Sequence, residues 1–161
     1  MGKIAGLLLL VAVINSCDAQ HRVQKAEAFF TVSIAGMAMK DENGNIINPQ
    51  PAIERFIYIE CKCSSKPKID SVFYNGILFV ASIADKEETS LKIGMRVNDQ
   101  KPVNLVPKKG NHTWKIDLQQ LNGATLKHEE VKKITIKGRL DKVKFNYAFN
   151  SETELSTPDR N

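Results

Sequence analysis

The sequence has almost no helical periodicity, few histidines and few cysteines. Three cysteines in 161 residues are too few for a small fold held together by disulfides. The histidines, His21, His112 and His128, lack metal-ligand spacing such as HxH or HxxxH. Neither a GxSxG nucleophile elbow nor a glycine-rich phosphate loop is present. We therefore predict a protein that is not an enzyme, with no catalytic residue, metal site or cofactor.

Only one long apolar run is present, and it lies at the N-terminus. Ile4–Ile14 is eleven residues of uninterrupted apolar sequence after Lys3. A membrane-spanning helix needs about 20 such residues, whereas a run of this length is typical of a signal peptide. We therefore predict that residues 1–19 are an export signal outside the fold.

The end of this segment, Ile14-Asn15-Ser16-Cys17, resembles the lipobox of bacterial lipoproteins. The resemblance covers only the signal and implies that Cys17 becomes the lipidated first residue of the mature chain. Several acyl chains would hold such a protein on a membrane almost permanently. Ordinary secretory cleavage after Ala19 is the alternative, and it would give a soluble periplasmic or secreted protein starting at Gln20.

The charge is moderately basic, with 23 Lys and Arg against 18 acidic residues and a net charge of +5. The lysines are dispersed along the chain, and an export signal takes the protein away from nucleic acid. We therefore expect no nucleic-acid partner. A weaker expectation is affinity for anionic surfaces such as phospholipid headgroups or acidic glycans, which salt would reduce.

Alternating apolar and polar residues dominate the rest of the chain, which predicts β-strands. The clearest stretches are 54–63, 91–97, 114–118 and 143–149. Both central residues of a type I′ turn need a positive φ, and the pair Asn75-Gly76 adopts such angles at low cost. Residues 69–84 are therefore predicted to form a tight hairpin. The segment 101–106 is a further candidate strand, which Pro102 and Pro107 would confine to the edge of a sheet.

Eight or nine short strands over about 125 residues predict an all-β fold, an antiparallel β-sandwich of immunoglobulin-like type. A small β-barrel is the alternative, since it would give the same pattern. We place a tether at 20–27, the sandwich domain at 28–150 and a flexible C-terminal tail at 151–161.

Cys61-Lys62-Cys63 is the one cysteine pair with a candidate role. On an extended strand, residues i and i+2 have Cα atoms about 6.6 Å apart, near the upper limit for a disulfide. Three interpretations stay open: two small core residues, a local disulfide or thiol pair, and a redox or soft-metal site.

The segment Lys101–Trp114 is the candidate binding loop. It is rich in proline, lysine and asparagine, and its Lys108, Lys109 and His112 are suited to an anionic group. We therefore predict an exported, lipid-anchored protein of the bacterial cell envelope that binds an envelope protein or a glycan. The alternatives are a redox or metal-binding protein that uses Cys61 and Cys63, and a structural subunit of an envelope assembly.

Overall fold

The computed structural model of the protein describes residues 23–33, 39–40, 42–43, 46–47, 51–62, 65–84, 91–120 and 131–156. These residues form strands and no helix, which confirms the predicted all-β fold. The strands are β1 (Val23–Ser33), β2 (Met39–Lys40), β3 (Ile46–Ile47), β4 (Ala52–Cys61), β5 (Lys68–Tyr74), β6 (Ile77–Ile83), β7 (Leu91–Met95), β8 (Pro102–Leu105), β9 (His112–Gln120), β10 (Ile134–Leu140), β11 (Val143–Phe149) and β12 (Glu152–Leu155).

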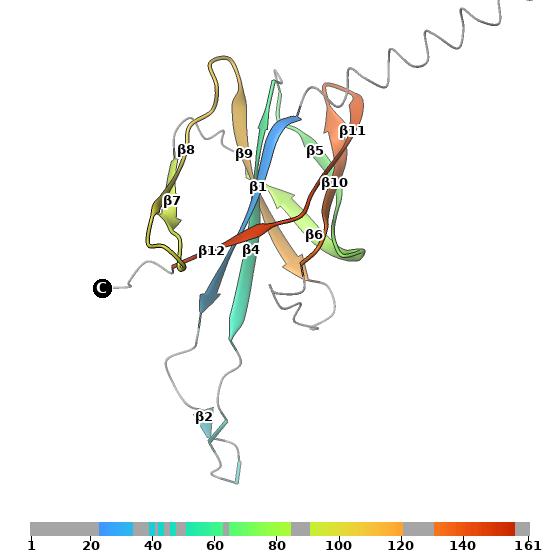
Figure 1. The fold of residues 1–161 in the computed structure, drawn as a ribbon. Coiled ribbons are helices and arrows are strands. Elements are labelled where there is room, and N and C mark those ends of the chain that lie inside the picture. The colour runs from blue at the N-terminus through green and yellow to red at the C-terminus, as the bar shows by residue number, and fades with distance from the viewer. Residues whose placement is uncertain are drawn as a thin grey trace, which may run out of the picture.

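Eight of these strands form one continuous sheet in the order β11-β10-β5-β6-β9-β4-β1-β12. The sheet curls so that β11 approaches β1 across its open side (Figure 1). The pair β7–β8 forms a small second sheet, and β2–β3 forms a separate short hairpin. This arrangement is consistent with a β-sandwich or a half-barrel. The β1–β12 pair is parallel, so the sheet is mixed rather than purely antiparallel.

The curled sheet encloses the main core. Alternate residues of the central strands point inward, as the period of two in the sequence predicts. The fully buried members of this core are Ile57, Ile59, Cys61, Val72, Tyr74, Ile116, Ile134, Ile136 and Leu140. A smaller cluster lies on the outer face, where β7 and β8 cover β1 and β4; it consists of Phe29, Tyr58, Val103, Leu105 and Leu155. The middle parts of β1 and β4 are therefore covered on both faces.

Two tight turns fix the register of the hairpins. Asn75 and Gly76 join β5 to β6 with φ of 49° and 88°, which confirms the hairpin predicted from the Asn-Gly pair. Asp141 and Lys142 join β10 to β11 with φ of 47° and 73°. Since neither of these is glycine, the pairing of Leu140 with Val143 must hold the second turn in its left-handed conformation.

The domain extends beyond its predicted boundaries at both ends. Val23 already belongs to β1 and pairs with Cys61, so the second half of the predicted tether is a strand. The predicted flexible tail contributes β12, which pairs with β1, and Leu155 is buried beneath β7 and β8. These short polar stretches become strands because they meet distant partners. The predicted leader, residues 1–19, lies outside the described residues.

A buried ion pair fastens β12 to the interior of the sheet. Arg55 on β4 donates to Glu152 through Nε (3.1 Å) and Nη2 (3.3 Å), and the two side chains are only 3% and 2% exposed. The guanidinium also lies over the rings of Phe30 and Tyr74, at 6.0 and 5.6 Å from their centroids. Two parallel hydrogen bonds and two aromatic faces thus compensate for removing the charge of Arg55 from water.

Tyr74 is completely buried, and its hydroxyl has no hydrogen-bond partner among the described residues. Burial, together with the charge of Glu152, raises the pKa of this phenol, so the hydroxyl stays protonated. An unsatisfied buried hydroxyl costs about 1–3 kcal/mol. Its ring packs on Phe79, with centroids 5.0 Å apart, and phenylalanine would keep that contact.

We therefore expect Tyr74→Phe to raise the free energy of unfolding by about 1 kcal/mol, because only the unpaired oxygen is removed. Urea unfolding with equal m-values measures the change. Tyr147→Phe, at a half-exposed tyrosine on β11, is the matched control and should be neutral. A loss of stability in Tyr74→Phe would show that the hydroxyl has a partner in solution.

Candidate functional site

The predicted binding loop connects β8 to β9 and is held in place by Glu60 at the end of β4. Glu60 Oε1 accepts a hydrogen bond from the backbone N–H of Lys108 (3.0 Å) and another from the side-chain amide of Asn111. Lys108 and Lys109 are exposed, whereas His112 is half-buried at the start of β9, opposite Cys61. The structure therefore gives the loop a fixed shape, but it does not bring these three side chains into one cavity.

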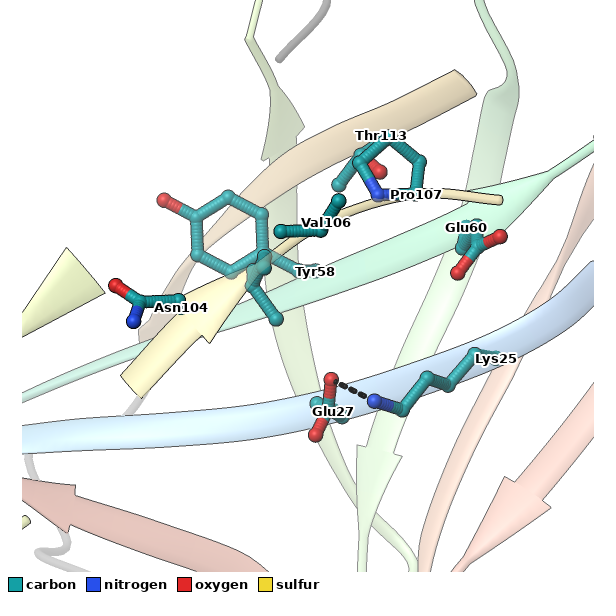
Figure 2. Close-up of a pocket in the computed structure, with 9 residues that line it drawn as sticks. Lys25, Glu27, Tyr58, Glu60, Asn104, Val106, Pro107 and Thr113 are labelled. Carbon is teal, nitrogen blue, oxygen red and sulfur yellow. Dashed lines mark ion pairs between the residues drawn. The ribbon is translucent and has the colours of Figure 1, made fainter. Parts of the chain in front are cut away.

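Beneath this loop is a small pocket, which we call the loop pocket (Figure 2). Lys25 and Glu27 form an ion pair of 2.7 Å on one side. The lining residues are Lys25, Glu27, Tyr58, Glu60, Asn104, Leu105, Val106, Pro107 and Thr113. Its volume of about 160 Å³ corresponds to about five waters at roughly 30 Å³ each and is below the roughly 300–1,000 Å³ of ligand sites. The loop pocket therefore suits water or a single side chain.

A second cavity lies at the same end of the sheet, beside the β10–β11 turn, and we call it the basic hollow. Its volume is about 600 Å³, and it is lined by Ser65, Lys66, Lys68, Arg139, Asp141 and Lys142. Four cations thus face one carboxylate, that of Asp141, which accepts a hydrogen bond from Ser65 Oγ (2.7 Å). The basic hollow has the charge to bind an anion.

Asp70 lies beside the basic hollow and is engaged by Arg139. The Nη2 group of Arg139 donates to Asp70 Oδ1 at 2.8 Å. This hydrogen bond is the main favourable contribution that holds the pKa of the Asp70 carboxyl below its usual value, and it outweighs the opposing desolvation. Asp70 is therefore ionised at neutral pH and fixes the orientation of the Arg139 guanidinium.

A third cavity, the outer hollow, lies on the outer face of β1, β4 and β9, toward the ends of β1 and β9. Its volume is about 660 Å³. The lining residues are Thr31, Ser33, Ile53, Glu54, Arg55, Phe56, Lys115, Asp117, Leu118, Gln119 and Gln120. Because Val23 and Ser33 are at opposite ends of β1, the outer hollow and the start of the chain's fold lie at opposite ends of the sheet (Figure 1).

Phe56 and Lys115 form the centre of the outer hollow. The ring of Phe56 stacks on Phe29 at 5.9 Å, and the Lys115 ammonium lies 4.9 Å from its centroid. Lys115 also forms an ion pair of 2.7 Å with Asp117. Around this centre, Glu54 and Gln119 are exposed. The hollow therefore combines one aromatic ring with hydrogen-bond donors and acceptors.

Sequence reasoning identified neither the outer hollow nor the basic hollow. Their side chains are the polar residues that alternate with core residues on each strand, and the sequence assigns such residues simply to a solvated face. The register decides which of them meet: Asp117 lies opposite Phe56, and Arg139 lies opposite Lys68. The polar alternation itself is the only sequence signal for either cavity.

Cys61 is fully buried and disulfide-bonded. Cys63 and Cys17 lie outside the described residues, so a disulfide between Cys61 and Cys63, one of the three interpretations above, remains untested, and lipidation of Cys17 stays a prediction. A disulfide-bonded sulfur is not a thiolate, which is the form that binds soft metals. In the redox or metal-binding alternative, this disulfide would first have to be reduced.

Within the described ranges, no group of three or more His, Cys, Asp or Glu side chains is placed to hold a metal ion. The same part of the chain contains no helix long and apolar enough to cross a bilayer. Comparison with known proteins gives no match to a family model, a curated protein or a solved structure.

Proposed function

We propose that the protein is a non-catalytic binding module of the bacterial cell envelope. It is held to the membrane by a lipid on Cys17 and takes up a glycan chain in the outer hollow. The lipobox-like Ile14-Asn15-Ser16-Cys17 supports the anchor. The mixture of polar groups around Phe56 in the outer hollow supports the glycan, and it is the observation that carries the proposal.

The size and lining of the outer hollow favour a glycan over a protein partner. At about 660 Å³ it falls within the usual range of ligand sites, roughly 300–1,000 Å³. Sugars need both donors and acceptors for their hydroxyls, and Glu54, Asp117 and Gln119 provide these around an apolar ring. Hot spots of protein interfaces are enriched in Trp, Tyr and Arg. Neither Trp nor Tyr is among the described residues that line this hollow, and its one arginine, Arg55, is buried and paired with Glu152.

The position of the outer hollow also fits this function. The eleven residues of β1 span roughly 35 Å at about 3.3 Å per residue. A chain anchored at Cys17, before β1, therefore holds the outer hollow near the far end of the domain. There it faces away from the membrane, toward the polymers of the envelope.

The direct test is titration of the protein with a panel of neutral and acidic polysaccharides by calorimetry and affinity electrophoresis. We expect Asp117→Asn and Glu54→Gln each to weaken binding of the recognised glycan by about ten- to hundredfold, because a hydrogen bond to a charged group contributes about 1.5–3 kcal/mol. Both side chains lie at the surface, so the variants should fold normally.

Asn104→Ala is the control, since this residue lines the loop pocket and not the outer hollow. It should bind the glycan like the wild type. Binding of no polysaccharide in the panel, or equal binding by the outer-hollow variants, would overturn the glycan proposal. The anchor is tested separately by mass spectrometry of the mature N-terminus, where an unmodified chain starting at Gln20 would exclude it.

A further inference from the structure

Four cations surround the basic hollow, and the fold itself holds them together. Lys66 lies just before β5 and Lys68 is its first residue, while Arg139 lies near the end of β10 and Lys142 follows in the β10–β11 turn. Arg139 pairs with Lys68 in the register of the two strands, and Lys142 is positioned by its φ of 73°. The cluster therefore depends on strand pairing rather than on a run of lysines in the sequence.

The nearby carboxylates neutralise only part of this cluster. Asp141 keeps its negative charge while it accepts a hydrogen bond from the hydroxyl of Ser65, and Asp70 forms an ion pair with Arg139, so two carboxylates stand against four cations. Among the described residues, neither Lys68 nor Lys142 has a carboxylate within ion-pair distance, and both are exposed. The hollow therefore presents an excess of positive charge to whatever faces this end of the sheet.

Strand β1 also begins at the end of the sheet that carries the basic hollow. Val23 pairs with Cys61 and packs in the core with Leu140 and Phe145, directly below the β10–β11 turn. Cys17 precedes Val23 by six residues, a length that reaches at most about 20 Å when fully extended. The β8–β9 connection, which carries Lys108 and Lys109, lies at this end as well (Figure 1).

We infer that this end of the sheet is a membrane-facing surface, and that the basic hollow binds the phosphates of anionic phospholipid headgroups. The inference rests on the proposed lipid anchor, which would bring this end to the bilayer. Basic residues next to a membrane are attracted by its negative surface potential over about a Debye length, roughly 8 Å. The surface would thus orient the domain, with the outer hollow pointing away from the membrane.

The test uses the chain from Asp18 to Asn161, which contains every described strand and lacks the acyl acceptor Cys17. Its binding to vesicles of phosphatidylcholine alone, and to vesicles that also contain phosphatidylglycerol, is measured by sedimentation at several salt concentrations. We expect binding only to the anionic vesicles, weakening as salt increases. Lys68→Glu combined with Lys142→Glu should reduce binding by about 25-fold or more, at about fivefold for each cation.

The matched control combines Lys132→Glu with Lys133→Glu. These exposed lysines contact the Asn75 turn at the opposite end of β10, and the change in net charge is the same. We expect this variant to bind like the wild type. Equal losses in both variants, or no binding to anionic vesicles, would each overturn the inference. None of these results would alter the glycan titration or the mass of the mature N-terminus.

Discussion

Replacing Glu152 by alanine is expected to lower the free energy of unfolding by about 3–5 kcal/mol. The carboxylate is 2% exposed and accepts two hydrogen bonds from Arg55, which is itself 3% exposed. Without Glu152, the guanidinium would stay buried without its counter-charge, and removing one partner of a buried pair has this large cost. Because Glu152 is on β12, the loss should also loosen the pairing of β12 with β1.

Urea unfolding measures the stability, and hydrogen exchange of the β1 and β12 amides measures the loosening. Glu154→Ala is the matched control: it lies two residues later on the same strand, is half-buried and forms no ion pair among the described residues. It should change stability by less than about 0.5 kcal/mol.

The combination of Arg55→Met with Glu152→Leu removes both charges together. It should recover most of the stability lost in Glu152→Ala, since apolar residues of similar volume often replace buried ion pairs without loss. A Glu152→Ala variant as stable as the wild type would contradict the proposed role of the pair.

The second large effect is expected at Gly138 on β10. A Cβ atom at this position would lie 2.5 Å from the carbonyl oxygen of Lys68 and 2.8 Å from two ring carbons of Phe145. The backbone oxygen belongs to the neighbouring strand, so it cannot move without disturbing the β5–β10 pairing. Overpacking of a rigid core typically costs 1–3 kcal/mol, and more where backbone must shift.

We therefore expect Gly138→Val to destabilise the protein by about 3 kcal/mol, seen as a lower urea midpoint and a lower melting temperature. Ala148→Val is the comparison, because Ala148 is an exposed residue on the adjacent strand β11. It should be neutral or slightly stabilising, since valine favours strands. An unchanged midpoint for Gly138→Val would show that the two strands separate more easily than their pairing indicates.

The predicted binding loop and the proposed site are different places, because no residue of the outer hollow was predicted as a site residue from the sequence. Within the predicted binding segment Lys101–Trp114, residues 106–111 form the β8–β9 connection and expose Lys108 and Lys109 as expected, whereas most of the flanking residues belong to β8 and β9. That Glu60 fixes this loop was not foreseeable, because Glu60 and Lys108 are 48 residues apart. The four cations of the basic hollow are likewise spread over two segments that meet only through the pairing of β5 with β10.

The sequence by itself determined the strands and the tight turn at Asn75-Gly76. A period of two and the φ angles of a turn are local properties, so a few neighbouring residues specify them. Only the tertiary structure decided that Arg55 is buried, that the polar C-terminal segment is a strand, and that the sheet curls around one core. The ion pair of Arg55 with Glu152 joins residues 97 positions apart, and no local pattern contains such a contact.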